Sequence, residues 1–466
     1  MPVAEAPQRI EDKTIQPIPP DERHGRTRDL FSLWFGSNIM LLTVVTGALA
    51  TSVYQLPFWL AVIAIVTGNL IGAIFMALHS AQGPRLGVPQ MMQTRGQFGS
   101  YGSLIVIVLV VLMYIGFFAS NLVLAGQSLN VLTSGISVDV GILLVGAVSV
   151  VVTIFGYDLI HAYARVMTYL AGAALLLTFI WIVAVHGAGH GFGSFGHASF
   201  AGFLGTVTAA ALWQIAYAPY VSDYSRYMPA DTGARPAFWA SYWGCSLGSI
   251  LPMILGALIG VNTADMVGGL HTETGAVASL VIVIFTVCIA MTNSMNIYGG
   301  ALSMIAIGQT FKPSWLPGAV ARAVLTVVIY VAAVVPAIVS QNDFLVNYSN
   351  FILLLMYVLV PWTAINLVDF YLVRHGNYDV AQFFRGDGGI YGRFDWVSIG
   401  CYLIGIAIEV PFVNTTMFEG PVAKGLNGVD ISWIICLIVI SPVYYLAAKR
   451  LRRPAAAVAE PAAVVA

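Results

Sequence analysis

Charged side chains and cysteines are both scarce in this chain of 466 residues. Asp, Glu, Lys and Arg make up 9% of it and leave a net charge of −1, which is too small to indicate a nucleic-acid or acidic partner. The 4 cysteines lie in apolar stretches without CxxC spacing, so the sequence predicts neither a disulfide framework nor a zinc site. We expect no signal peptide, because the polar first 28 residues lack an apolar core followed by a cleavage site.

Long apolar runs fill most of the remaining chain. Hydrophobic residues make up 59% of it, and about a dozen stretches are long enough to cross a bilayer as helices. We therefore expect an all-α polytopic membrane protein with about 12 transmembrane helices and no long soluble domain. The expected spans are 29–53, 58–81, 100–131, 138–156, 164–187, 201–221, 236–262, 275–297, 318–340, 343–370, 396–417 and 430–448.

The basic residues predict the orientation of these spans. Of the 20 Lys and Arg residues, 19 fall in alternate loops or at the chain ends, and Lys424 is the exception. Because positive charge favours the cytoplasmic side, we expect a multi-pass protein of the cytoplasmic membrane with both termini in the cytoplasm. The expected organisation is a cytoplasmic tail over 1–28, a transmembrane domain over 29–448 with its core at 29–370 and extra helices at 396–448, and a cytoplasmic tail over 449–466.

Two of the spans contain residues that interrupt helices. In the first span, Gly36 precedes Ser37 and Asn38, whose side chains compete for backbone hydrogen bonds. In the sixth span, Pro219 cannot donate a backbone hydrogen bond and frees the carbonyl one turn earlier. The two spans are five helices apart, which predicts two five-helix halves of inverted topology with a binding site between the broken helices. A kink tolerated for packing is the alternative at each position.

Amides and aromatic residues inside the spans indicate the kind of ligand. Phe117 and Asn121 share one face of the third span, because they are four residues apart. Thr292, Asn293 and Asn296 cluster within little more than one turn of the eighth span. An interhelical hydrogen bond is the simpler explanation for any single asparagine. Together these groups fit a planar, uncharged ligand, since rings stack on aromatic faces and an amide pairs with the edge of a heterocycle.

One acidic residue, Glu409, lies within the eleventh span. An ionisable group inside the membrane is a candidate for proton coupling. The eleventh span lies outside the expected ten-helix core, so a structural role or a role in an outer vestibule is the alternative.

At these polar positions the chain resembles the purine/cytosine permeases of the nucleobase:cation symporter family. The resemblance covers nearly the whole chain, with the same order and spacing of motifs. It is carried by LWFGSN at 33–38, by 83–99 with GPRLG and RGQFG at its ends, by 116–127, by 213–229 with SDYSRY at its centre, and by TNSMNIY at 292–298.

This resemblance implies a leucine-transporter-like inverted repeat with two extra C-terminal helices. It implies a cation-coupled importer that works by alternating access on a nucleobase or related heterocycle, such as cytosine, a purine, allantoin or a hydantoin. The expected substrate-binding residues are Ser37, Asn38, Phe117, Asn121, Trp213, Gln214, Asn293 and Asn296.

The resemblance also implies a coupling cation, with no other metal or cofactor. A sodium ion would bind backbone oxygens near Met40 and Thr43 together with the hydroxyl of Thr292. Met291 departs from the family pattern, because sodium-coupled members tend to have a second hydroxyl at this position. Proton coupling through Glu409 therefore stays open beside sodium coupling.

Other classes of protein fit less well. An amino-acid permease of the same architecture would need a glycine-rich, carboxylate-binding break in the first span, which residues 36–38 do not supply. An enzyme would need a facing nucleophile and base, or metal ligands, within the spans. A channel has no need of paired broken helices around a compact site. We expect a monomeric transporter whose partners are a small-molecule substrate and membrane lipids.

Overall fold

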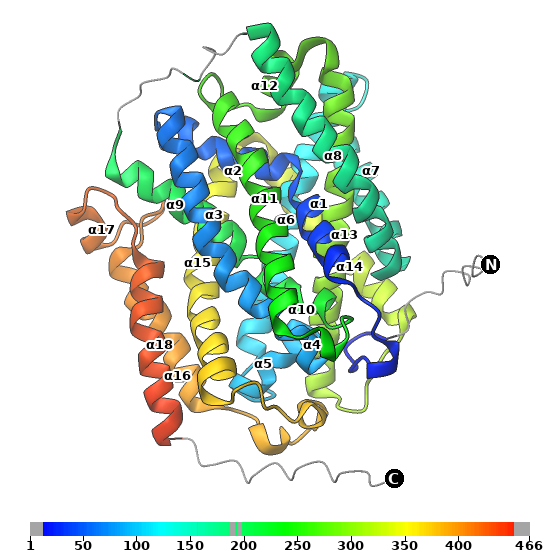
Figure 1. The fold of residues 1–466 in the computed structure, drawn as a ribbon, viewed down its shortest axis with the longest axis vertical. Helices are drawn as coiled ribbons and strands as arrows, with labels where there is room; N and C mark the ends of the chain where they lie inside the picture. Colours follow the sequence, from blue (N-terminus) through cyan, green and yellow to red (C-terminus); the bar gives the residue numbers. More distant parts are fainter. Residues whose placement is uncertain (1–12, 156, 187–191, 193–197, 452–466) are drawn as a thin grey trace.

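The computed structural model is built of helices packed side by side (Figure 1), and it describes residues 13–155, 157–186, 192 and 198–451. No strand occurs in this described part of the chain. The predicted tail residues 1–12 and 452–466 lie outside it. The α-helices are α1 (Thr27–Asn38), α2 (Leu41–Ser52), α3 (Phe58–Ser80), α4 (Gly83–Leu86), α5 (Gln90–Phe98), α6 (Leu104–Leu132), α7 (Val138–Phe155), α8 (Tyr157–His186), α9 (Phe200–Ile215), α10 (Ala218–Ser225), α11 (Ala234–Gly260), α12 (Met266–Thr274), α13 (Ala278–Phe311), α14 (Ala319–Ser340), α15 (Phe344–Val368), α16 (Trp396–Glu409), α17 (Pro421–Gly425) and α18 (Ser432–Leu451).

A helix occupies each range in which a span was predicted. Within the described residues, 9 helical stretches are long and apolar enough to cross a membrane, or up to 10 if the bent pair α1 and α2 is one span. One of these stretches, 319–373, contains both α14 and α15, which are two of the predicted spans. The helix of the eleventh span, α16, has only 14 residues, because Pro411 follows its last turn. The all-α polytopic class is confirmed, and the number twelve stays a prediction.

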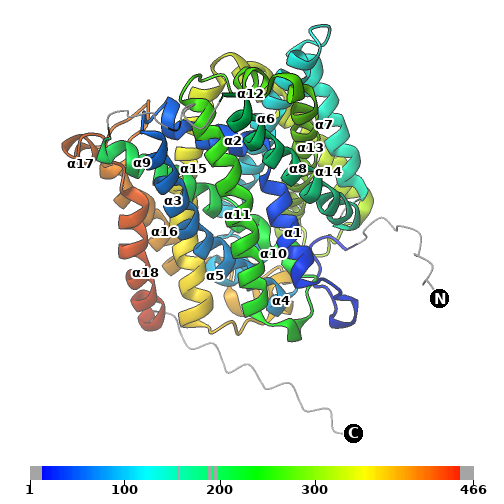
Figure 2. The same ribbon diagram turned by 45° about the horizontal axis from the view of Figure 1, so that its top comes forward.

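The helices form two packing groups. In the first group, α11 packs against α1, α2 and α3, and α3 also packs against α9 and α10. In the second group, α13 packs against α6 and α7, and α14 packs against the same two helices. The late helices α16 and α18 pack on each other and on α15, at one edge of the molecule in both ribbon views (Figures 1 and 2).

The first span is broken at Ile39 and Met40, where α1 and α2 meet at a bend of 59°. The predicted interruption is therefore present, but it begins immediately after residues 36–38, where it was expected. Gly36 lies inside α1 and has a different role. A Cβ atom at Gly36 would lie 2.5 Å from Thr168 Oγ1 and 3.2 Å from the Ala164 carbonyl oxygen. This glycine thus allows α8 to approach α1 closely.

The sixth span is also interrupted, immediately before its proline. Helix α9 ends at Ile215, and α10 begins at Ala218. Pro219 lies in the first turn of α10, where its missing N–H removes no helical hydrogen bond. The short helix α10 therefore starts afresh beside the break.

The segment 13–26 folds against the end of the molecule that holds α4, α5 and α10. The backbone N–H of Ile18 donates to the Gly87 carbonyl at 2.9 Å, and that of Gly25 donates to the Tyr227 carbonyl at 3.0 Å. Arg226 Nη1 donates to the Thr14 carbonyl at 2.8 Å. This part of the predicted N-terminal tail is docked onto the helical domain.

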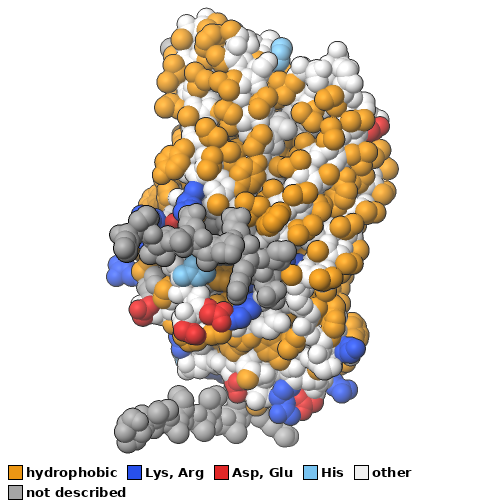
Figure 3. All heavy atoms as spheres, turned by 90° about the vertical axis from the view of Figure 1, so that its right-hand side faces the viewer, with side chains coloured by type: hydrophobic (Ala, Val, Ile, Leu, Met, Phe, Trp, Pro, Cys, Tyr) orange, Lys and Arg blue, Asp and Glu red, His pale blue; other side chains and the backbone are white. Residues whose placement is uncertain are grey.

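Hydrophobic side chains cover most of the upper and middle surface in Figure 3, whereas most of the visible charged side chains gather near its lower end. Large apolar residues such as Trp59 on α3, Leu112 on α6 and Ile180 on α8 are exposed. An apolar surface of this extent is typical of helices that face lipid. The protein is thus a multi-pass membrane protein.

The contact between α2 and α11 yields a prediction about stability. A Cβ atom at Gly256 would lie 1.8 Å from the Val44 carbonyl oxygen. We expect Gly256→Ala to lower the unfolding temperature in detergent, measured by size exclusion after heating, because overpacking costs about 1–3 kcal/mol.

Gly400 on α16 is the matched control, because no atom lies within 4 Å of a Cβ placed there. Gly400→Ala should leave the unfolding temperature unchanged or raise it, since alanine favours a helix over glycine by about 0.5–1 kcal/mol. Equal unfolding temperatures for the two variants would contradict the close packing of α2 on α11.

Candidate functional site

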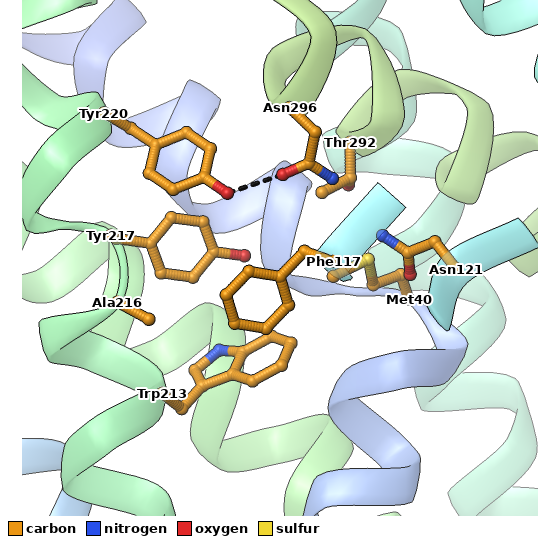
Figure 4. Close-up of a pocket in the computed structure, with 9 residues that line it drawn as sticks. All are labelled: Met40, Phe117, Asn121, Trp213, Ala216, Tyr217, Tyr220, Thr292 and Asn296. Atoms are coloured by element: carbon orange, nitrogen blue, oxygen red, sulfur yellow. Dashed lines mark hydrogen bonds between the residues drawn. The ribbon is translucent and has the colours of Figure 1, made fainter. Parts of the chain in front are cut away.

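The two broken spans and two continuous helices, α6 and α13, surround a small cavity (Figure 4). Its volume is about 10 Å³, which is room for about one water molecule. None of the 9 lining residues is charged. They are Met40, Phe117, Asn121, Trp213, Ala216, Tyr217, Tyr220, Thr292 and Asn296.

Four predicted substrate residues line this cavity: Phe117, Asn121, Trp213 and Asn296. The rings of Phe117 and Trp213 lie edge to face, with centroids 6.1 Å apart and an interplanar angle of 84°. Figure 4 shows Trp213 below Phe117, with Asn296 above Phe117 and Asn121 to its right. The structure thus brings aromatic rings and amides from α6, α9 and α13 to one place.

Asn121 is the polar side chain of this cavity that lacks a partner. Its amide nitrogen and its amide oxygen are both buried, and neither has a hydrogen-bond partner among the described residues. A buried polar atom in this condition costs about 1–3 kcal/mol. An amide presents a donor and an acceptor side by side, so a ligand edge with the complementary pair would satisfy both atoms.

Asn38 lies behind Trp213 rather than in the cavity lining. The indole Nε1–H donates to Asn38 Oδ1 at 2.8 Å and to Ser249 Oγ at 3.1 Å. Asn38 Nδ2 in turn donates to the Trp34 carbonyl at 2.7 Å. These bonds satisfy the one polar atom of the indole, so Asn38 acts as a positioning residue that fixes the ring facing the cavity.

Gln214 also lies outside the cavity lining. Its Nε2 donates to Asn69 Oδ1 at 2.7 Å and to Ser249 Oγ at 3.1 Å, which directs the side chain toward α3 and α11. Neighbouring residues of a helix do not share a face. Because Trp213 faces the cavity, the next residue is turned away from it.

Asn296 is hydrogen-bonded at both ends of its amide. The Tyr220 hydroxyl donates to Asn296 Oδ1 at 2.5 Å, drawn as a dashed line in Figure 4. Asn296 Nδ2 donates to Asn293 Oδ1 at 3.3 Å. Asn293 itself does not line the cavity, and its Nδ2 is buried without a partner in the described part of the chain.

Three lining residues were missed by the sequence reasoning: Ala216, Tyr217 and Tyr220. Trp213, Tyr217 and Tyr220 follow one another at spacings of four and three, which is the spacing of one helix face. That spacing is the signal that could have identified the tyrosines. Tyr217 packs edge-on against Trp213, with ring centroids 5.9 Å apart.

Thr292 reaches the break in the first span, as the cation prediction requires. Its hydroxyl donates to the Ser37 carbonyl at 2.9 Å and to the Cys288 carbonyl at 3.3 Å. The Ser37 side chain donates within α1, so Ser37 faces this junction through its backbone. Oxygen atoms are the ligands that hard cations prefer. Met291 beside Thr292 is buried and adds a thioether in place of an oxygen.

The other two predicted cation residues lie at the same break. The Thr43 hydroxyl donates to the Asn38 carbonyl. Met40 starts α2, and its side chain lines the cavity. The residues predicted to bind sodium thus meet at the turn between α1 and α2, where Met40 also lines the cavity.

Glu409 is buried at the end of α16, outside the cavity. Its neighbours include Cys436 on α18 and Asp430, which precedes that helix. The separation from the substrate residues agrees with its expected place outside the ten-helix core.

Hydrogen bonds between helices lie beyond the lining residues on both sides of the cavity. Toward the predicted outer side, Thr46 on α2 and Tyr348 on α15 share a hydrogen bond of 2.7 Å. A second, larger cavity of about 270 Å³ lies on that side, lined partly by Leu124 and Gln127, one to two turns beyond Asn121 on α6. Toward the opposite end, two hydrogen bonds hold α10. Arg226 Nη2 donates to the Tyr298 hydroxyl at 3.1 Å, and the Tyr114 hydroxyl donates to the Pro219 carbonyl at 3.0 Å.

An uncharged site between two interrupted helices is typical of a helical secondary transporter. The comparisons with known proteins agree with this class. The chain belongs to the family of permeases for cytosine/purines, uracil, thiamine and allantoin, which it matches over residues 17–436.

Individual relatives and one solved structure are similar over nearly their full lengths. The chain is 39% identical to a putative purine-cytosine permease, YxlA, of Bacillus subtilis, covering 96% of this chain and 98% of that protein. It is 24% identical to the purine-cytosine permease fcyB of Emericella nidulans, covering 91% and 85%. Its fold matches that of Mhp1, a nucleobase-cation-symport-1 family transporter solved in a closed conformation with bromovinylhydantoin bound, with a TM-score of 0.75, 21% identity and coverage of 96% and 97%.

These similarities confirm the family resemblance, the leucine-transporter-like fold and the transporter class. They do not favour the alternative of an amino-acid permease.

The contrast between Asn121 and Gln214 yields a prediction for the ligand-free protein. Asn121→Leu should keep or raise the unfolding temperature, because it removes two unpaired buried polar atoms. Gln214→Leu should lower the stability by about 1 kcal/mol, because the loss of the bonds to Asn69 and Ser249 outweighs the removal of the unpartnered Gln214 Oε1. Thermal unfolding of both variants in detergent measures the difference, and a larger loss in Asn121→Leu would contradict the assignment of Asn121 as the unpaired group.

Proposed function

We propose that this permease imports a nucleobase or a related planar heterocycle, such as cytosine, a purine, allantoin or a hydantoin, together with a cation. The observation that carries the proposal is the unpaired Asn121 amide, which lines an uncharged cavity together with the rings of Phe117 and Trp213. The names of its relatives support this ligand class, since they include purine-cytosine permeases and a hydantoin permease of Microbacterium maritypicum that is 23% identical.

The chemistry of binding follows from the lining. Phe117 and Trp213 provide ring surfaces for a planar substrate. Asn121 pairs with one edge of the ring, and Asn296 would meet a second polar group after its hydrogen bond to Tyr220 has opened. The absence of charge among the 9 lining residues favours a neutral ring and offers a carboxylate no ion-pair partner.

Alternating access accounts for the closed geometry. A cavity of about 10 Å³ holds about one water molecule, so a heterocycle enters only after the surrounding side chains and helices have moved. The bonds Thr46 to Tyr348 and Arg226 to Tyr298 lie toward opposite ends of the cavity, and opening either end would expose the site to one side of the membrane.

The membrane and the oligomeric state complete the proposal. We place the protein in the cytoplasmic membrane with both termini in the cytoplasm, because 19 of its 20 Lys and Arg residues lie in the predicted inner segments. We also propose that the protein functions as a monomer.

Sodium is the coupling cation that the site supports better. The Thr292 hydroxyl and the Ser37 carbonyl meet at the first break, where unwound backbone supplies ligands for sodium in transporters of this architecture. Proton coupling through Glu409 is the second candidate, because Met291 removes a hard oxygen from the same region.

Binding of a base is the test of the proposed function. Thermal stabilisation of the purified protein should identify a ligand in a panel of cytosine, adenine, hypoxanthine, allantoin, hydantoin and amino acids. Asn121→Ala should weaken the affinity for that ligand roughly five- to more than a hundredfold, since a buried amide pair contributes ~1–3 kcal/mol. Trp213→Ala should abolish binding, because it removes the ring surface.

Ser120→Ala is the control for this test, because Ser120 lies beside Asn121 on α6 and donates to the Gly116 carbonyl outside the cavity. Its affinity should equal that of the wild type. Stabilisation by amino acids alone, or wild-type affinity in Asn121→Ala, would reject the proposed substrate class.

The cation prediction concerns Thr292. Thr292→Ala should raise the sodium concentration for half-maximal uptake roughly tenfold, equivalent to the loss of about 1.4 kcal/mol, whereas Thr292→Ser should preserve it because the hydroxyl remains. The sodium concentration for half-maximal uptake is measured in proteoliposomes, with choline replacing sodium. Uptake that is unchanged by this replacement but is abolished by a protonophore would reject sodium coupling. Loss of the proton dependence in Glu409→Gln would then assign the coupling to Glu409.

A further inference from the structure

One amide of the cavity is already occupied by a side chain of the protein. The Tyr220 hydroxyl donates to Asn296 Oδ1 at 2.5 Å, and both residues line the cavity (Figure 4). Asn296 Nδ2 is engaged with Asn293 Oδ1 at 3.3 Å, so the oxygen is the end of the amide that Tyr220 contacts. The hydroxyl therefore takes the place in which an N–H of a bound heterocycle would meet Asn296.

This hydrogen bond also joins parts of the molecule that belong to different packing groups. Tyr220 lies on α10, the short half of the broken sixth span, and Asn296 lies on α13. The Tyr220 ring packs edge-on against Tyr114 at 4.5 Å, and the Tyr114 hydroxyl donates to the Pro219 carbonyl at 3.0 Å. The position of the Tyr220 hydroxyl thus depends on the position of α10.

We propose that Tyr220 is an internal substitute for the substrate. Its hydroxyl bonds to Asn296 in the empty carrier and gives way to a substrate N–H in the loaded carrier. This inference rests on the proposed function and assigns a step of the cycle to one residue.

The physical reason is the cost of an unpaired oxygen in a closed, lipid-surrounded site. A carrier that has released its substrate has to pass through a closed state before it can bind again. Without Tyr220, the Asn296 oxygen would lack a protein donor in that state, which is unfavourable in a cavity with room for only about one water molecule. The tyrosine removes this cost and so permits the empty carrier to return.

The same geometry sets a specificity rule. Because Asn296 presents its oxygen toward Tyr220, only a substrate with a donor at that edge can replace the hydroxyl. A ring that is N-methylated at that edge, or that carries an acceptor there, should fail to displace Tyr220.

The test compares net uptake with exchange in proteoliposomes. Net uptake requires the empty carrier to return, whereas exchange of external labelled base for internal unlabelled base does not. The base is the member of the panel above that stabilises the wild type most strongly. In Tyr220→Phe, net uptake should fall at least fivefold relative to exchange, and binding should tighten roughly two- to tenfold because the competing hydroxyl bond is gone.

Tyr402→Phe is the matched control. Tyr402 is buried on α16, and its hydroxyl donates to the Val358 carbonyl at 3.1 Å, outside the cavity. This variant loses one buried tyrosine hydrogen bond but should keep the wild-type ratio of net uptake to exchange. Exchange in the Tyr220→Phe vesicles also shows that the variant is folded and inserted.

Three results would overturn the assignment. Net uptake and exchange could fall by the same factor in Tyr220→Phe, or both could stay at wild-type rates, and either result removes the role in the empty carrier. Weaker binding of the base would show instead that Tyr220 donates to the substrate directly. A wild-type protein that binds no base of the panel is a different outcome, because it removes the proposed function itself.

Discussion

Inside a membrane, every buried polar group has to find its partner within the protein, because the surrounding lipid offers none. Most polar atoms of the side chains behind the cavity follow this rule, and Gln214 Oε1 is an exception, since it is buried without a partner among the described residues. Trp213, Asn38, Ser249, Gln214 and Asn69 form one connected set of hydrogen bonds that joins α1, α3, α9 and α11. Asn121 departs from the rule at the cavity itself. Among the described residues that line the cavity, only Asn121 has buried amide atoms without partners, and this is why we propose it as the group that a ligand would bind.

The interrupted helices depend on the same constraint. A break leaves backbone groups without their helical partners, and at the first break a side chain from the other packing group bonds to one of them. Thr292 of α13 donates to the Ser37 carbonyl at the first break, and Tyr114 of α6 donates to the Pro219 carbonyl beside the second. Each broken span is thus held by a helix of the opposite group. A movement of one group against the other has to exchange these bonds, which links them to alternating access.

Properties that depend on many residues could be predicted from the sequence, and those that depend on the direction of one side chain could not. Length and hydropathy indicated the membrane class and the spans, and residues 36–38 and Pro219 indicated the two interruptions. Phe117 and Asn121 reach the cavity because one continuous helix carries them. Gln214 turns away because one residue rotates a helix by about 100°. Tyr220 lies beyond the second break. It shares a helix face with Trp213 only because α10 nearly continues the direction of α9. The direction of one helix relative to another depends on tertiary packing and could not be predicted from the sequence.

The first break connects the residues predicted to bind a cation with the indole ring of Trp213, which lines the cavity. The Ser37 carbonyl accepts from Thr292, and the next residue, Asn38, accepts from the indole of Trp213. A cation bound between Ser37 and Thr292 would order the same turn that orients Trp213. Each ligand would then favour binding of the other, because coupling between two sites is reciprocal. Glu409 lies on α16, which packs against α15 and α18, so a proton there would act on the ring through more intermediates. The shorter connection is the physical ground for placing sodium first.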